Sequence, residues 1–496
     1  MGSNELVSLA PIEDTAAVPQ ANRPRGITRR QALAAAVATG VGVGVVRLLG
    51  GSMQQISTTH TASASDWISP LNTESARVMH LLRRTSMGYT QSQLESALSD
   101  GYAKTVDRLI DTPPAEPPAF AAAETPGGRF AITDLQQWWV DHMLTTPTPF
   151  AERMTLFWHG HFTSDYRKAA DNTFMYWQNL TWRRMAMTDL RSMVMNVTID
   201  PAMLRYLDLA TSTGQSPNEN YSREVMELFT MGAGNYTEDD VREGAKALAG
   251  WTLPQPDSVA TVVVDKANNV TRRLPVYSTQ RPGVFNPRRA YKGSVTYLGK
   301  TGPLDTQGVI DRILAQPATA PFIARKVAEH FVTERPSAGY VKSLGDTFRR
   351  SGYDMKTLMR AVFTSPEFVS GDSYRALVKS PTELMVHAAR MLGLTSPGKV
   401  VVAGGSGMGQ SLFDPPDVNG WPNNESWISS NTVVQRVNFV TAALAQAKGT
   451  LPSPADAVHH QLDGVLSKQT SDLFNQAADD RARWFIVLAS PEFQLK

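Results

Sequence analysis

The stretch Ser216–Trp251 reads SPNENYSREVMELFTMGAGNYTEDDVREGAKALAGW, and its pattern decides the predicted fold. Ser216 at a cap position, Pro217 in the first turn and Glu219 three residues after the cap together predict the start of a helix. Apolar residues then recur at helical spacing, which predicts a buried face made of Tyr221, Val225, Leu228 and Phe229.

A second helix follows a glycine turn. Gly232 and Gly234 are expected to end the first helix, and Thr237 is expected to cap the next one. Three acidic residues after Thr237 suit the positive first turn of a helix, and the apolar face is Val241, Ala245 and Leu248. The stretch therefore predicts a helical pair within a mainly α protein.

A polar stripe runs beside the apolar face of the first helix. Asn220, Glu224 and Glu227 lie at i, i+4 and i+7, and Arg223 is next to them. In one interpretation, Arg223 and solvent satisfy the two carboxylates on an ordinary surface. In the other, the stripe faces a cavity that holds a metal or a polar substrate. Glu224 and Glu227 are then candidate catalytic groups, and Asn220 and Arg223 are candidate substrate ligands.

The segment Phe157-Trp158-His159-Gly160-His161-Phe162 offers candidate metal ligands. Two histidines one residue apart cannot share a helix face, but a bend at Gly160 after the helix would let both rings point to one centre. Imidazole is a usual ligand of zinc, iron, copper and nickel. The alternative is that His159 and His161 bond to backbone or carboxylate groups in an aromatic core.

A rigid loop is predicted from Phe413 to Pro422, FDPPDVNGWP, because its prolines fix the backbone. Asp414 is a candidate metal ligand there. Asp417, Trp421 and, further on, Trp427 are candidate substrate-binding residues. The alternative is a packed plug that closes the helical body. The preceding run VVVAGGSGMG, residues 400–409, is expected to be a flexible loop, because it lacks the ending of a phosphate-binding loop.

Several of these motifs resemble one bacterial family, the domain-of-unknown-function 1800 family. The resemblance rests on NENYSREVMELFTMGAGNYTEDDVREGAKALAGW, on FWHGHF, on FDPPDVNGW and on HLLRRTSMG at His80–Gly88. It implies a mostly helical, exported bacterial protein without an established reaction. Relatives are often encoded beside an exported family, domain-of-unknown-function 1501, that resembles sulfatases, which makes such a protein a candidate partner. Where relatives often have a His-Asp pair, this chain has Ala290 and Tyr291.

The amino-terminal region predicts export. Arg29 and Arg30 precede a short apolar run, Ala34–Val46, as in a twin-arginine (Tat) signal. Ala62-Ser63-Ala64 offers a cleavage site, and an uncleaved anchor is the alternative. We expect residues 1–64 to be the signal with its flanking segment and 65–496 to be one helical domain. Membrane contact is expected only through the signal, and the protein is expected in the periplasm, the envelope or the medium.

Composition narrows the function classes. The chain has 496 residues, 42% of them hydrophobic, and a net charge of +2, so no strong field indicates nucleic acid. It has no cysteine, which excludes disulfides and thiolate chemistry. Alternating residues between about 255 and 300 predict a small β-insertion that contains a hairpin.

Two functions fit the sequence. The first is hydrolysis of an envelope or polysaccharide substrate in a polar cavity lined by His159, His161, Glu224, Glu227 and Asp414. No cofactor is identified. A divalent metal held there by three or four N/O ligands would activate water, with a glutamate as general base. The second is a non-catalytic envelope scaffold, or a partner or maturation factor of the co-encoded protein.

Overall fold

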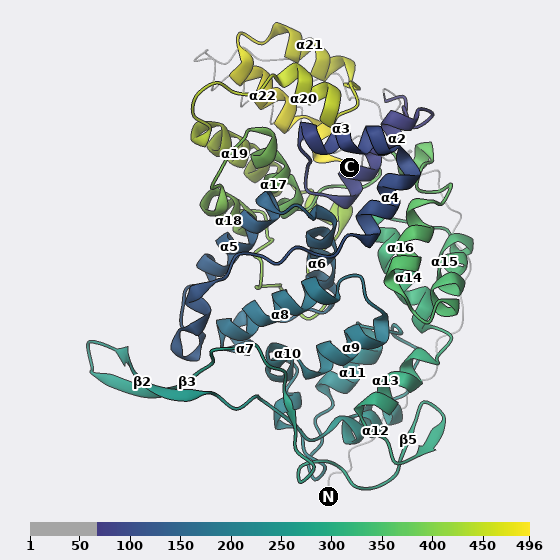
Figure 1. The fold of residues 1–496 in the computed structure, drawn as a ribbon, viewed down its shortest axis with the longest axis vertical. Helices are drawn as coiled ribbons and strands as arrows, with labels where there is room; N and C mark the ends of the chain where they lie inside the picture. The colour runs from purple at the N-terminus through teal and green to yellow at the C-terminus, as the bar shows by residue number, and fades with distance from the viewer. Residues whose placement is uncertain (1–66) are drawn as a thin grey trace, which may run out of the picture.

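A computed structural model describes residues 67–496. The predicted export signal and its cleavage site lie outside these residues. The described chain is mainly helical, which confirms the predicted fold class, and its strands form two-stranded sheets (Figure 1). Between residues 67 and 496, no helix has the length and apolar character needed to span a membrane.

Helix α6 (Pro149–His161) lies between two hydrophobic cores. Its residues Met154 and Trp158 are buried in the first core, whereas Leu156 is buried in the second. A helix of this kind needs apolar side chains on more than one face. The sequence PFAERMTLFWHGH supplies them, and every residue from Phe150 to His159 is buried.

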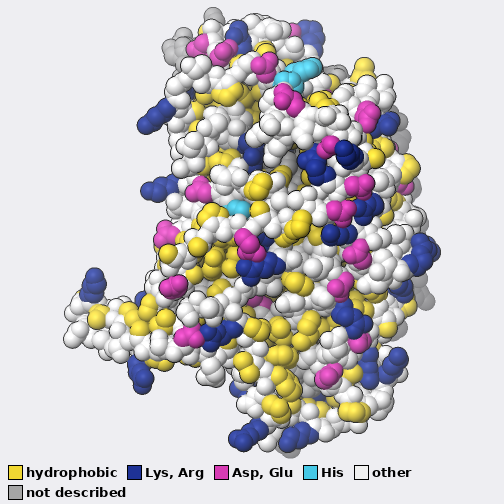
Figure 2. Space-filling view, in the orientation of Figure 1, with side chains coloured by type: hydrophobic (Ala, Val, Ile, Leu, Met, Phe, Trp, Pro, Cys, Tyr) yellow, Lys and Arg dark blue, Asp and Glu magenta, His cyan; other side chains and the backbone are white. Residues whose placement is uncertain are grey.

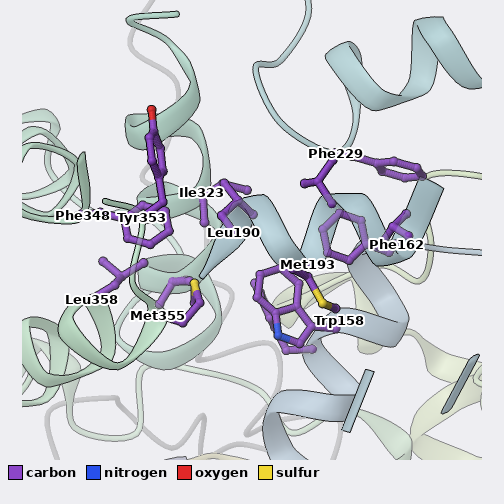
Figure 3. Close-up of a cluster of buried hydrophobic side chains, with 14 of the residues drawn as sticks. Trp158, Phe162, Leu190, Met193, Phe229, Ile323, Phe348, Tyr353, Met355 and Leu358 are labelled. Atoms are coloured by element: carbon purple, nitrogen blue, oxygen red, sulfur yellow. The ribbon is translucent and has the colours of Figure 1, made fainter. Parts of the chain in front are cut away.

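The first core is built mainly by helices of the middle of the chain. Figure 3 shows part of it, where Trp158 and Phe162 lie beside Met193 of α9, and Met355 and Leu358 of α16 belong to the same cluster. The contributing helices include α4 (Tyr102–Asp111), α9 (Leu190–Ile199), α10 (Pro201–Tyr206), α11 (Asn220–Glu227), α12 (Glu238–Leu248), α13 (Thr306–Leu314), α14 (Thr319–Phe331), α15 (Ala338–Arg350) and α16 (Met355–Phe363).

The second core joins helices from the two ends of the described chain. Its helices are α5 (Ile132–Thr145), α8 (Asn172–Met185), α17 (Pro381–Met391), α18 (Gly398–Gly407), α19 (Ser430–Gln446), α22 (Asp480–Ala489) and α23 (Pro491–Gln494). Helices α2 (Glu74–Thr85), α3 (Gln91–Asp100), α7 (Tyr166–Ala169), α20 (Pro454–Gln461) and α21 (Lys468–Gln476) pack around the two cores.

The predicted β-insertion is present. Strands β2 (Ser258–Asp265) and β3 (Val270–Val276) form an antiparallel hairpin that extends from the body in Figure 1. The other pairs are β1 (Trp251–Thr252) with β4 (Val284–Phe285), and β5 (Val295–Tyr297) with β6 (Lys300–Gly302). The hairpin side chains Val259, Val263 and Val270 are 41–47% exposed, and Figure 2 shows hydrophobic side chains along this arm.

The helical pair of Ser216–Trp251 forms, but its start was predicted wrongly. Helix α11 begins at Asn220, after Glu219, and no side chain caps it in the way proposed for Ser216. Instead Ser216 and Thr213 exchange backbone hydrogen bonds in a turn, both at 3.1 Å. The predicted Thr237 cap is confirmed, with a reciprocal bond to Asp240.

The glycine-rich run predicted as a flexible loop is helix α18. Glycine lowers helix propensity, but here it lets the helix pack closely against its neighbours. A Cβ on Gly404 would lie 2.7 Å from Met385 Sδ, and a Cβ on Gly405 would lie 2.7 Å from the Gln410 carbonyl oxygen. Tertiary packing therefore overrides the local preference.

Candidate functional site

The two histidines of the His-x-His motif lie on α6 and point to different sides of it. Gly160 is inside the last turn, and Phe162 ends the helix by donating its backbone N–H to the Trp158 carbonyl at 2.7 Å. Residues two apart on a helix differ by about 200° in direction. The prediction of a bend that lets both rings point to one centre is therefore wrong.

His159 holds the loop that contains Phe413. Its Nε2 accepts a hydrogen bond from the backbone N–H of Phe413 at 3.0 Å. Its ring centroid is 5.0 Å from that of Trp139 and 5.1 Å from that of Trp421. Burial lowers the pKa of His159 to about 3, so the ring is neutral and acts as an acceptor.

His161 faces the first core and a cavity. Its Nε2 donates to the Phe229 carbonyl at 3.0 Å, so this nitrogen carries the proton of the neutral ring. Burial first, and then the charge of Lys326, lower the pKa of His161 to about 3. The ring lies parallel to that of Phe157, with centroids 6.0 Å apart. Nδ1 is then the ring atom that can accept a bond.

The acidic stripe of α11 contacts residues other than His159 and His161. Glu227 accepts a hydrogen bond from the Tyr236 hydroxyl. Burial and then the neighbouring Glu227 raise the pKa of Glu224, which Arg223 partly offsets. Arg223 pairs with Glu238 at 2.7 Å and with Glu219 at 3.4 Å.

Asn220 also has a partner away from the histidines, because its amide donates to Asp208 at 2.8 Å.

The loop aspartates do not join the histidines either. Asp414 pairs with Arg167 at 2.5 Å, and Asp417 accepts the backbone N–H of Asn419 at 2.7 Å. Burial raises the pKa of Tyr206 to about 12, with further contributions from the carboxylates of Asp165, Asp417 and Glu224. One carboxylate of the stripe, Glu224, and one of the loop, Asp417, thus act on Tyr206.

The ligand set predicted from His159, His161 and Asp414 is not brought together. Within residues 67–496, no group of three or more His, Cys, Asp or Glu side chains is placed so that it could hold a metal ion. The physical reason is local, because each of the three groups is turned to a different partner, namely a backbone N–H, a backbone carbonyl and an arginine.

A close backbone contact fixes the loop on α6. Gly420 has φ +83°, and a Cβ there would lie 2.3 Å from the Gly160 carbonyl oxygen and 2.9 Å from Thr163 Oγ1. Only glycine suits both the conformation and the space. The contact places the neighbouring Trp421 ring against His159.

A cavity of about 160 Å³ lies beside the end of α6. This is well above the roughly 10–15 Å³ that one water molecule needs, so it has room for several waters or a small ligand group. Among the predicted site residues, His161, Trp421 and Trp427 line it, whereas His159, Glu224, Glu227, Asp414, Asp417, Asn220 and Arg223 do not.

Charged residues that the sequence did not single out line the rest of the cavity. Helix α14 supplies Lys326, Glu329 and His330, α17 supplies Glu383, and the segment after α23 supplies Lys496. The α14 residues share one helix face at i, i+3 and i+4, and that pattern was the signal that could have identified them. Amide groups of Gln410, Asn419, Asn423 and Asn424 complete the polar lining.

The charges of the lining depend on burial. Burial raises the pKa of Glu329, although Lys326 and Arg325 lower it. Burial, then Arg153 and Lys496, hold the pKa of His330 well below its ordinary value. His330 Nε2 and Trp421 Nε1 find no hydrogen-bond partner among residues 67–496. The cavity therefore presents a carboxyl with a raised pKa, neutral imidazoles and an unpaired indole N–H.

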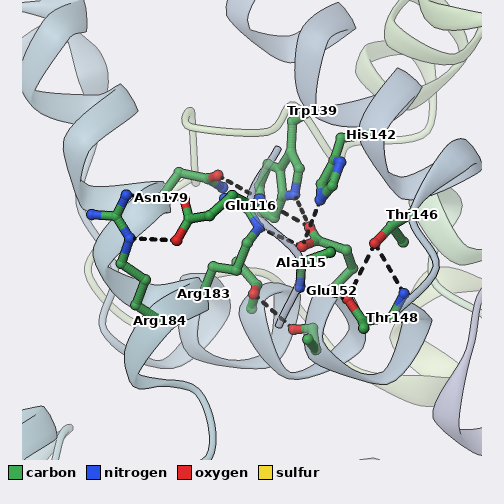
Figure 4. A network of polar contacts seen from close by, with 12 residues as sticks. Ala115, Glu116, Trp139, His142, Thr146, Thr148, Glu152, Asn179, Arg183 and Arg184 are labelled. Atoms are coloured by element: carbon green, nitrogen blue, oxygen red, sulfur yellow. Dashed lines mark hydrogen bonds and ion pairs between the residues drawn. The ribbon is translucent and has the colours of Figure 1, made fainter. Parts of the chain in front are cut away.

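A buried ionic network supports the wall behind His159. Glu152 accepts from Trp139 Nε1 at 2.8 Å and from Arg183 Nη2 at 2.9 Å, with His142 beside it (Figure 4). Burial alone would raise the pKa of Glu152, but Arg183 and His142 hold it at about 2. The network joins α5, α6 and α8 and fixes the ring that His159 packs against.

Comparison with known proteins gives a family. A family model described as "Protein of unknown function (DUF1800)" matches residues 80–495. The comparisons with curated proteins and with solved structures return no match.

Proposed function

The chain belongs to the DUF1800 family of proteins of unknown function, and from that premise we propose that its cavity binds a sugar residue, such as the terminal unit of an envelope polysaccharide. The lining carries the proposal, because it combines two indole rings, Trp421 and Trp427, with amides and charged groups. An indole offers a large apolar surface and one donor. Amide side chains can donate and accept at sugar hydroxyls.

Calorimetric titration with a panel of neutral and acidic sugars tests this binding. We expect Trp421→Phe, which removes the unpaired Nε1–H, and Lys326→Gln to weaken binding about tenfold each, the worth of a net hydrogen bond or a charged contact. The matched control Lys104→Gln removes an exposed cation paired with Asp100 away from the cavity, and it should change nothing. Absence of binding by every sugar of the panel at millimolar concentration would overturn the proposal.

Hydrolysis of the bound sugar is the finer form of this proposal, and Glu329 supports it. This carboxyl lines the cavity, and its raised pKa suits a general acid. It would give its proton to the leaving oxygen as the glycosidic bond breaks, while water attacks the anomeric carbon and releases its own proton to solvent, from which Glu329 is protonated again. We expect Glu329→Gln to abolish the release of reducing sugar from a bound polysaccharide and to leave binding within about threefold. Full activity of this variant would exclude the assignment.

A second proposed function is attachment to a partner, and the exposed valines of the β2–β3 hairpin favour it. The candidate partner is the co-encoded exported protein of the domain-of-unknown-function 1501 family. Deletion of residues 258–276 should abolish co-purification with that protein and leave sugar binding unchanged. Co-purification that survives the deletion would remove the hairpin from the interface.

Export through the Tat pathway remains part of the proposal and has its own test. The twin arginine, Arg29 and Arg30, supports it. Replacing both with lysine should keep the protein in the cytoplasmic fraction, whereas unchanged export would contradict the assignment.

A further inference from the structure

The floor of the cavity adjoins a group with more buried bases than acids. Glu383 contacts Arg153 and Lys496, and the same carboxylate faces Arg436 and Lys379. All five side chains belong to buried residues. Arginine stays protonated in proteins, so Arg153 and Arg436 already outnumber the single carboxylate of this group. Concentrated positive charge away from water is costly unless anions balance it.

Part of this charged group opens into the cavity. Lys496, His330 and Glu383 line the cavity, and Arg153 lies directly behind Glu383. His330 Nε2 and Arg153 Nη2 have no hydrogen-bond partner within the described part of the chain. The amino-terminal end of α17 also lies here, since Ser380 caps that helix and lines the cavity. Its dipole adds further positive potential at the same place.

We infer that this floor is an oxyanion subsite, which seats a phosphate, sulfate or carboxylate group carried by the bound sugar. Lys496 and His330 Nε2, with its proton on that nitrogen, would donate to the oxyanion, and Arg153 would supply charge from behind. The inference rests on the proposed sugar cavity and adds the chemical class of its ligand. It gives a partner to the unpaired Nε2 of His330 and offsets the excess of positive charge.

Proton uptake follows from the same arrangement. Burial, with Arg153, lowers the pKa of Lys496 to about 7, while Glu383 opposes the shift. Arg84 of α2 adds to the lowering, and His330 of α14 faces the same group. A bound anion favours the ammonium form. Above pH 7, sulfate affinity should therefore fall about tenfold for each pH unit, because a proton must be taken up before the anion binds.

Titration of the purified protein with sodium sulfate, at ionic strength held constant with chloride, tests the subsite directly. We expect saturable sulfate binding at pH 6 and its loss as the pH rises to 9. Lys496→Gln should lower sulfate affinity at least tenfold and remove the pH dependence. Lys468→Gln, which removes an exposed lysine paired with Asp472, is the matched control and should behave as the wild type. If Lys496→Gln does not fold, the wild-type pH series and His330→Phe, which removes the free donor, take its place.

Binding of neutral and acidic sugars distinguishes a failure of this inference from a failure of the proposed function. A uronic acid, a sugar phosphate and a sugar sulfate should bind more tightly than the neutral sugar and should compete with sulfate, and their ranking identifies the source of the oxyanion. Binding of the neutral sugar without any sulfate binding would overturn the subsite and leave the sugar cavity standing. Sulfate binding without competition from any sugar would instead overturn the sugar cavity. Sulfate affinity that is the same in Lys496→Gln and the wild type would place the anion elsewhere.

Discussion

Two similar Glu–Arg ion pairs of this protein differ strongly in burial, and Glu152 belongs to the buried pair. Its carboxylate and Arg183 are each 1% exposed, whereas Glu116 and Arg184 form a similar pair that is 60% and 48% exposed. Figure 4 shows the two pairs side by side. A buried ion that loses its partner keeps its desolvation cost, but an exposed ion is hydrated again.

Glu152→Gln should therefore lower the free energy of unfolding by about 3–5 kcal/mol, because Arg183 keeps a buried, uncompensated charge. Glu116→Gln is the matched control and should cost less than about 1 kcal/mol. Urea unfolding at pH 7 measures both values. Equal effects of the two substitutions would show that burial of the pair does not matter.

Asp200 makes stability depend on pH. Burial raises its pKa to about 7, although the Met203 N–H, at 2.9 Å, and the Gln178 amide, at 2.8 Å, donate to its Oδ1. The folded state therefore binds this proton more tightly than the unfolded state, whose carboxyl has its ordinary pKa near 4. Stability from this group is complete below pH 4 and is lost as the pH rises to 7, at about 1.4 kcal/mol per pH unit.

Asp200→Asn keeps an oxygen acceptor for both bonds and removes the charge. We expect the variant to match the wild type near pH 4 and to be more stable at pH 8 by a few kcal/mol. Unfolding by urea at pH 4, 6 and 8 gives the comparison, and the difference between the two proteins isolates this residue from other titrating groups. A difference that does not change with pH would mean that Asp200 is already ionised in the folded state.

At the scale of elements, the contact between α6 and the 413–422 loop positions the cavity wall. The Cβ that Gly420→Ala introduces would clash with the Gly160 carbonyl oxygen. The residue also has a left-handed backbone conformation, which is unfavourable for alanine. Gly409 has nearly the same φ, +85°, but nothing lies within 4 Å of its added Cβ. We expect Gly409→Ala to cost about 1–2 kcal/mol through the backbone alone.

Gly420→Ala should cost a further 1–3 kcal/mol, the usual cost of overpacking, and should weaken sugar binding because Trp421 moves with the loop. Thermal unfolding and titration of both variants check this. Equal stability of the two variants would mean that the loop shifts freely on α6.

Local elements could be predicted from the sequence more fully than the site. The face Tyr221, Val225 and Phe229, the Thr237 cap and the β2–β3 hairpin follow from spacing within a few residues, and the structure contains them. Glycine misled the prediction where tertiary packing decided the outcome, as in α18 and at Gly160 within α6. In α18 glycine allows another segment to come close, whereas a Cβ on Gly160 would meet only Trp421, at an ordinary contact distance of 3.9 Å.

The cavity depends on long-range arrangement, which no local pattern encodes. His161, Lys326, Glu383 and Lys496 come from four separate parts of the chain, and nothing in their spacing shows that they meet. The His-x-His motif was predicted to bind a metal because imidazole is a usual metal ligand. Its two rings point to different sides of α6, which excludes a shared metal centre. Trp421 was predicted from the rigid loop and Trp427 from the segment beyond it, and both line the cavity.

At the scale of the whole molecule, α6 makes the two cores depend on each other. Met154 and Leu156, two residues apart, are buried in different cores. We propose that residues 67–496 unfold as one unit, as the single-domain prediction requires. Met154→Ala and Leu156→Ala should each lower the free energy of unfolding of one shared transition by about 2–5 kcal/mol.

Helicity and tryptophan fluorescence, followed together in urea, test this because coincident curves indicate a two-state transition. Two separate steps, each shifted by only one of the substitutions, would divide the chain into two domains.

The hairpin also gives an experimental handle. Its turn, residues 266–269, lies at the end of the projecting arm, and Asp265 organises it by accepting the N–H groups of Ala267 and Asn268. Exposed turns tolerate insertions well. A short peptide tag or a photo-crosslinking amino acid placed there would label the protein far from both cores, and it would report which neighbours the arm touches in a living cell.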